Sequence, residues 1–178
     1  WDELIPGRGK IRLVACGGTA LTLMGYKEST KDVDFLVPKA EEYERLTGFL
    51  QEAGYQRSTQ YGWMRKGETI LFDLYPGKRV YTTELLTSPL DRGGCKKWKE
   101  WKKIFVGILN PLDLMISKMF RGAETDIQDS LLLLFKGNVN RTKFEARYRE
   151  TAQYEINEAK VLRNLDLLLK RWKKGKEL

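Results

Sequence analysis

Three aspartates lie within short apolar segments and are the first candidates for chemistry. Asp32 and Asp34 alternate with apolar residues in Asp32–Val37, and Asp73 interrupts the apolar segment Ile70–Leu74. On a strand, residues i and i+2 point to one face, so the first two carboxylates are expected side by side. Like charges that close are unfavourable unless a cation lies between them, and Mg²⁺ takes oxygen ligands. If the two segments are neighbouring strands, Asp73 adds a third carboxylate to the same metal site.

A glycine pair, Gly17-Gly18, separates the apolar segment Ile11–Cys16 from a short helical segment, Thr19–Met24. Glycine lets the backbone approach a ligand closely, and the free N–H groups at a helix start attract anions. Glycine turns between a strand and a helix are common, however, and a DxD pair at a strand end can simply be solvated. Asp73 could equally be paired with a basic side chain.

The composition excludes several classes of site. There is no histidine among the 178 residues, which excludes Ser-His-Asp and Cys-His nucleophiles and any His-ligated zinc or iron. Two cysteines are too few for a disulfide scaffold or a four-cysteine zinc site. We expect a cytoplasmic protein without membrane contact, since no apolar segment approaches the ~20 residues of a membrane span. The net charge of +8 is compatible with a polyanionic partner.

The elements that must position the candidate residues follow from the apolar spacing. That spacing predicts an α+β chain, with a mixed sheet and flanking helices in residues 1–109 and a C-terminal helical bundle in 110–178. A capping box is expected at Thr125–Gln128. The predicted strands are Ile11–Cys16, Asp32–Val37, Tyr55–Lys66, Thr69–Tyr75 and Ile104–Leu109. The predicted helices are Thr19–Met24, Lys39–Ala53, Pro111–Arg121, Asp126–Lys136, Arg141–Tyr154 and Asn157–Lys174.

Taken together, these motifs resemble those of the nucleotidyltransferase superfamily, which has the polymerase-beta-like fold. Its pattern is an hG[GS] turn, a spacer of this length and Dh[DE]h, matched here by Gly17-Gly18 and by Asp32 to Phe35. The resemblance implies that Asp32 and Asp34 bind two Mg²⁺ ions. It further implies that Asp73 contacts one ion and helps to activate the acceptor hydroxyl.

Within the superfamily, the chain is similar to the AbiEii-like group. The matching residues are CGGTAL at 16–21, the D-x4-K of Asp113–Lys118, Arg121, and the D-x-x-D of Asp126–Asp129. The resemblance implies that Gly17, Gly18 and Thr19 receive the β- and γ-phosphates of an NTP and that Lys118 reaches toward the triphosphate. Asp126 and Asp129 would hold the helix pair together. The alternative for Lys118 is a place on a solvated helix face.

The implied function is Mg²⁺-dependent transfer of an NMP group from an NTP to a hydroxyl on RNA (such as tRNA), a protein or a small molecule. The AbiEii-like resemblance adds a toxin-like role with a small antitoxin-like partner. Two departures support a second hypothesis, a catalytically inactive module that binds nucleotide or nucleic acid. Gly18 stands where many relatives have serine, and Glu28 stands where arginine is usual.

A basic segment, Asp91–Lys103, carries six basic residues against two acids, with Trp98 and Trp101 among them. Lysine and arginine neutralise phosphates, and exposed aromatic rings can stack on unpaired bases, so the segment could contact RNA. Tryptophans three residues apart also fit one face of a helix. The second interpretation is therefore an amphipathic connection whose tryptophans pack on the core.

Overall fold

The computed structural model describes residues 1–137 and 139–176, and the chain divides into two compact units. The first, Trp1–Val80 with Thr87–Asn110, contains the sheet; the second, Tyr81–Leu86 with Pro111–Leu178, contains the C-terminal helices. Residues 81–86 cluster with the helices although strands of the sheet follow them in sequence. Over the described residues, no helix is both long and apolar enough to cross a bilayer.

The first unit is built on a seven-stranded mixed sheet, which confirms the predicted α+β class. Its strand order is β3-β4-β5-β2-β1-β9-β8. The central strand β2 pairs in parallel with β5 and antiparallel with β1, which in turn pairs in parallel with β9. The strands are β1 (Ile11–Ala15), β2 (Asp32–Val37), β3 (Tyr55–Arg57), β4 (Gly62–Arg65), β5 (Leu71–Pro76), β8 (Cys95–Glu100) and β9 (Ile104–Leu109). Two further short strands are β6 (Arg79–Val80) and β7 (Thr83–Glu84).

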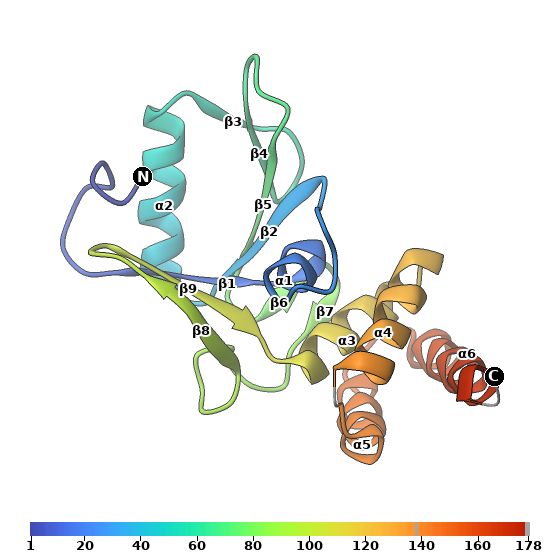
Figure 1. Ribbon diagram of the computed structural model, residues 1–178. Helices are drawn as coiled ribbons and strands as arrows, with labels where there is room; N and C mark the ends of the chain where they lie inside the picture. The colour runs from blue at the N-terminus through green and yellow to red at the C-terminus, as the bar shows by residue number, and fades with distance from the viewer. Residues whose placement is uncertain (138, 177–178) are drawn as a thin grey trace. The chain divides into compact units, whose positions relative to one another are not determined.

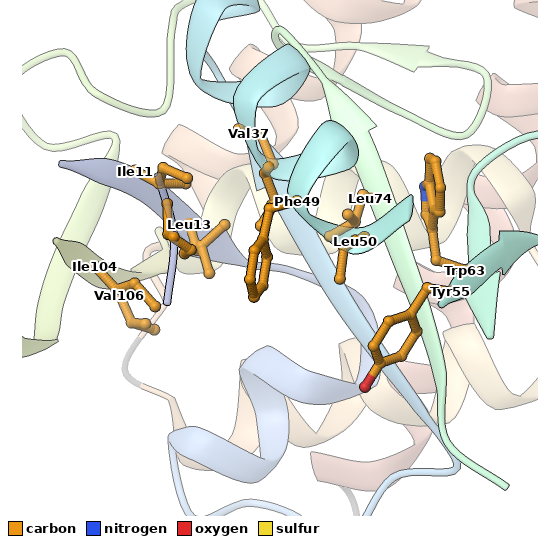
Figure 2. Close-up of a cluster of buried hydrophobic side chains, with 12 residues drawn as sticks. Ile11, Leu13, Val37, Phe49, Leu50, Tyr55, Trp63, Leu74, Ile104 and Val106 are labelled. Carbon is orange, nitrogen blue, oxygen red and sulfur yellow. The ribbon is translucent and has the colours of Figure 1, made fainter. Parts of the chain in front are cut away.

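Helix α2 (Ala40–Glu52) covers one face of this sheet, and α1 (Gly17–Leu23) follows β1 directly (Figure 1). Leu46, Phe49 and Leu50 lie at helical spacing on one side of α2 and are buried against the sheet. Figure 2 shows Phe49 and Leu50 among apolar side chains of the strands, namely Ile11, Leu13, Leu74, Ile104 and Val106. Burial of each large apolar side chain contributes about 1.5–3 kcal/mol, so this cluster holds the strands and α2 together.

Two parts of the sheet differ from the sequence prediction. The predicted single strand Tyr55–Lys66 is two antiparallel strands, β3 and β4, joined by a tight turn. In that turn the Gly62 N–H donates to the Thr59 hydroxyl at 2.8 Å, which satisfies the backbone where the chain reverses. Of the two interpretations of Asp91–Lys103, the amphipathic connection with one buried helix face is wrong, because this segment contains the edge strand β8.

The second unit contains four helices in the described residues, α3 (Pro111–Arg121), α4 (Glu124–Lys136), α5 (Arg141–Ala152) and α6 (Glu158–Lys176). Phe120 and Phe144 each meet Tyr148 edge to face within it, and the Tyr148 hydroxyl donates to the Val161 carbonyl at 2.7 Å. The predicted capping box at Thr125–Gln128 is wrong. Helix α4 begins at Glu124, and the Asp126 carboxylate accepts from the Ala123 N–H at 3.2 Å.

Candidate active site

The register of two parallel strands brings the three aspartates to one face of the sheet. Asp34 on β2 is the direct neighbour of Asp73 on β5, and Asp32 is the neighbour of Leu71. Residues in register on parallel strands point the same way, as do residues i and i+2, so all three carboxylates share that face. The alternate residues of these strands, including Leu74, lie on the side of the hydrophobic core. The structure therefore places Asp73 beside the Asp32–Asp34 pair.

The burial of these carboxylates is uneven. Asp34 and Asp73 are only 8% and 7% exposed, whereas Asp32 at the start of β2 is exposed. Burial raises the pKa of Asp73, and the nearby charge of Asp32 raises it further. An Asp73 carboxylate is thus held where its negative charge is disfavoured, and a cation or a proton would relieve it.

The start of α1 is fastened to β2 through three hydrogen bonds. The Thr19 hydroxyl accepts from the Asp34 N–H at 2.8 Å and donates to the Asp32 carbonyl at 3.3 Å. The Gly18 N–H donates to Asp34 Oδ2 at 3.1 Å. A threonine hydroxyl can donate only one proton, and at Thr19 that proton goes to the Asp32 carbonyl. In this structure that hydroxyl therefore positions the backbone that carries Asp32 and Asp34.

Both glycines of the turn are required by close neighbours. A Cβ at Gly17, which has φ +52°, would lie 2.4 Å from Asp34 Oδ2. A Cβ at Gly18 would lie 2.4 Å from the Thr30 hydroxyl. Thr30 thus fills the space in which a serine side chain at position 18 would begin. The sequence signal for Thr30 is its place two residues before Asp32.

Thr19 is the residue on which this arrangement is most simply tested. Thr19→Val keeps the shape but removes both hydrogen bonds, and we expect it to lower the free energy of unfolding by about 1–3 kcal/mol. Thr19→Ser keeps the hydroxyl and should lose under 1 kcal/mol. Urea unfolding of the two variants measures the difference. Equal stability of the valine and serine variants would show that the hydroxyl does not hold β2.

The residues present fit a hard divalent cation. Within residues 1–137 and 139–176, no group of three Asp, Glu or Cys side chains is already placed to coordinate one metal ion. The donor set is nevertheless all oxygen and on one face, and burial together with the charge of Asp32 raises the pKa of Asp73. Mg²⁺ binds carboxylates of this kind together with substrate phosphates. Asp32, Asp34 and Asp73 are the residues that would hold it.

The pKa of Asp73 leads to a pH-dependent prediction. Because that pKa is raised on folding, the folded chain binds the proton more tightly, and the contribution of Asp73 to the free energy of unfolding falls as the pH rises above about 4. Asp73→Asn removes the charge and should raise the free energy of unfolding at pH 7 by about 0.5–2 kcal/mol in EDTA. The gain should disappear at acid pH.

The same variant reports on the cation. Millimolar Mg²⁺ should raise the melting temperature of the wild type and have little effect on Asp73→Asn. Thermal unfolding with EDTA or Mg²⁺ at several pH values measures both effects. A wild type that does not respond to Mg²⁺, with no pH-dependent difference between the proteins, would contradict a cation site at Asp73.

Lys118 belongs to the helical unit and is engaged there by two carboxylates. Its ammonium donates to Asp129 Oδ2 at 2.7 Å and lies 3.7 Å from Asp126 Oδ1. All three side chains are buried. Arg121, whose side chain is partly exposed, also binds Asp126. The solvated-face interpretation of Lys118 is therefore wrong. A contact between Lys118 and a triphosphate stays a prediction.

The fold is shared with a protein of known structure. The crystal structure of ANT(2'')-Ia in complex with adenylyl-2''-tobramycin superposes with a TM-score of 0.56 at 14% identity, covering 81% of this chain and 88% of that one. ANT(2'')-Ia is an aminoglycoside nucleotidyltransferase of polymerase-beta-like fold. This chain has a nucleotidyltransferase fold.

Other comparisons gave a weaker structural match and no sequence match. A solution structure of the antibiotic-resistance factor ANT(2'')-Ia matches with a TM-score of 0.43 at 16% identity, covering 94% of this chain and 86% of that one. No protein-family model matches the chain, and no curated protein matches it. At such identities the nucleotidyltransferase fold is what the chain and ANT(2'')-Ia share.

Proposed function

We propose that this protein is a nucleotidyltransferase that moves an NMP group from an NTP to an acceptor hydroxyl. The observation that carries the proposal is the register of β2 and β5, which sets Asp34 beside Asp73 with Asp32 on the same face. Three carboxylates on one face of the sheet, within a nucleotidyltransferase fold, support this proposal. None of the roles in the proposal requires histidine, which the chain lacks.

Each aspartate has a distinct part in the proposal. Asp32 and Asp34 bind the divalent ions, and their backbone is held by the Thr19 hydroxyl. The Gly18 N–H also holds one Asp34 oxygen, which limits rotation of that carboxylate. When bound, the ions would neutralise charge on the oxygens around the transferred phosphorus. Asp73 has a raised pKa, which suits a group that accepts the proton of an acceptor hydroxyl.

The phosphate-binding residues remain part of the proposal. Gly17, Gly18 and Thr19 begin α1, where backbone N–H groups favour the β- and γ-phosphates. The Thr19 hydroxyl is occupied by β2, so we propose that Thr19 contributes its backbone and not its side chain. Lys118 would add positive charge for the triphosphate only if it left its carboxylate partners.

The acceptor is proposed by chemical class. The solved structure of ANT(2'')-Ia holds tobramycin carrying an adenylyl group, which makes ATP and a small-molecule hydroxyl one natural pair to test. RNA, including tRNA, and protein hydroxyls are the others. Each α-labelled NTP should be incubated with Mg²⁺ and, separately, with aminoglycosides, total RNA or protein. Transfer of label to one acceptor, absent in EDTA, supports the proposal, and no labelled product with any acceptor contradicts it.

A second function is favoured by the state of the glycine turn. The Gly18 N–H is already occupied by Asp34, as expected if the turn stabilises the fold of a binding module without catalysis. Titration with NTP discriminates the two functions. Tight NTP binding that is indifferent to Mg²⁺ and releases no pyrophosphate supports the module, whereas Mg²⁺-dependent binding with pyrophosphate release supports the transferase.

The AbiEii-like assignment, with a toxin-like role, is proposed on sequence motifs. Its second block falls on α3 and α4, where Asp126 and Asp129 both bind Lys118 and so link the two helices. The contact between Lys118 and a triphosphate, which the motif implies, is a separate part of the proposal. The test is whether expression of the chain arrests growth and whether a small protein encoded next to it relieves the arrest. Growth unaffected by the active chain would remove the toxin-like role and leave the transferase proposal intact.

A further inference from the structure

Strand β8 forms one edge of the sheet (Figure 1). Its side chains make a basic, aromatic surface. Every residue from Lys96 to Lys102 is exposed. Trp98 and Trp101 keep 47% and 37% of their surface exposed. The residues of this β8 surface are Lys96, Lys97, Trp98, Lys99, Trp101 and Lys102. Two neighbouring tryptophans in water are unusual, because tryptophan is a largely buried residue type.

A bulge in β8 brings the two indole rings together. Lys97 pairs with Gly107 and Lys99 with Val106, so Trp98 is an extra residue without a partner on β9. In a regular strand, residues three apart point to opposite faces, and a bulge re-aims the side chains. The ring centroids of Trp98 and Trp101 lie 6.3 Å apart. The sequence interpretation of a buried helix face does not hold, and the rings are open to a flat partner.

The charge of this surface is positive after its internal pairs are counted. Glu100 is the one acid between residues 96 and 102, and it is bound by Lys97 at 2.9 Å and Lys10 at 3.0 Å. Lys96, Lys99 and Lys102 form no ion pair with any described residue. Lys99 instead lies 4.7 Å from the centroid of the Trp101 ring. Three lysines therefore remain to meet an anion beside the exposed rings.

We propose that the β8 surface binds a single-stranded nucleic acid, with the lysines on phosphates and the tryptophans stacked on unpaired bases. A lysine-rich edge alone would only discourage strands from pairing. The exposed tryptophans are not needed for that purpose. A second copy of the chain is disfavoured at this edge, because its own β8 lysines would face these lysines. The proposal does not rest on nucleotidyl transfer, since it uses none of the three aspartates.

The test measures binding of labelled 12-mer RNA and DNA oligonucleotides to the full chain in EDTA without NTP, by fluorescence anisotropy and tryptophan quenching. Trp98→Ala with Trp101→Ala should lower affinity at least about 10-fold. The double Phe variant should keep most of the affinity but lose the quenching, since phenylalanine still stacks. A duplex of the same sequence should bind more weakly, because its bases are already stacked. If the RNA and DNA oligonucleotides differ in affinity, the tighter one shows whether the surface prefers ribose or deoxyribose.

The charge contribution has a matched control. Lys96→Ala, Lys99→Ala and Lys102→Ala together should weaken binding and reduce the slope of log K against log salt by roughly 2, since each phosphate contact contributes about 0.7. Lys143→Ala, Arg149→Ala and Lys160→Ala remove the same charge from exposed sites on the helical unit and should leave binding near wild type.

Three results would overturn the proposal: no oligonucleotide binds, the two triple variants lose affinity equally, or the double alanine variant binds as the wild type does. Repeating the titration with Asp34→Asn tests oligonucleotide binding independently of the proposed nucleotidyl transfer. That variant should bind the oligonucleotide normally whether or not the wild type transfers nucleotides.

Discussion

Asp34→Asn should reduce nucleotidyl transfer by roughly three orders of magnitude or more while the chain stays folded. Asparagine has the shape of aspartate, and its Oδ1 can still accept from the Gly18 N–H, which donates to Asp34 at 3.1 Å. What is lost is the negative charge beside Asp73, on which cation binding depends in the proposal. Single-turnover transfer and Mg²⁺ titration measure the two consequences.

The choice of substitution and control matters here. Asp34→Ala would also remove the partner of the Gly18 N–H, so a loss of activity could reflect a displaced α1. Asp166→Asn makes the same chemical change at an exposed carboxylate in the helical unit and should leave transfer unchanged. Full activity in Asp34→Asn, with Mg²⁺ affinity as in the wild type, would refute the assignment of Asp34 as a metal ligand.

Lys118→Met should lower the free energy of unfolding by about 3–5 kcal/mol. The Lys118 side chain is 5% exposed, and its ammonium binds Asp129 at 2.7 Å, with Asp126 at 3.7 Å. Without it, two buried carboxylates lose their shared positive charge, and Arg121 remains as a partner of Asp126. Urea unfolding followed by far-ultraviolet circular dichroism measures the loss, since the cluster lies among helices.

A second variant separates stability from catalysis. Lys118→Met with Asp129→Leu replaces the ion pair by apolar side chains and should recover most of the lost stability. If that stable double variant also has an unchanged KM for NTP, Lys118 is structural and does not serve the triphosphate. Lys160→Met, at an exposed position, should stay within about 0.5 kcal/mol of the wild type. Wild-type stability of Lys118→Met itself would contradict the buried ion cluster.

Elements whose signals are local could be predicted closely from the sequence. The strand Asp32–Val37 and the helix Pro111–Arg121 occur with the predicted bounds. In the first, aspartates alternate with apolar residues at the start of the strand and an apolar pair ends it before a proline. In the second, a proline at the first position and a following glycine mark both ends. Such signals depend on neighbours in sequence, so no tertiary contact is needed to recognise them.

Elements whose side chains meet water could not be predicted in this way. Strand β8 has almost no buried side chain, so its residues carry no apolar alternation that would mark a strand. It is a strand because its backbone pairs with β9, and this pairing is not encoded in its side-chain pattern. The turn between β3 and β4 was missed for a similar reason, since it depends on the Thr59 hydroxyl and contains neither proline nor a central glycine.

The same distinction between local and long-range signals applies to the candidate site. The types and spacing of Gly17, Gly18, Asp32 and Asp34 were sufficient to propose the chemistry, because carboxylates two apart on a strand must share a face. Whether Asp73 joins them depends on which strand lies beside β2, a long-range pairing that only the folded chain specifies. The tertiary structure also assigned the Thr19 hydroxyl to β2 and Lys118 to buried carboxylates. A side chain's partners depend on which elements pack together, and the spacing of residues along the chain does not contain that information.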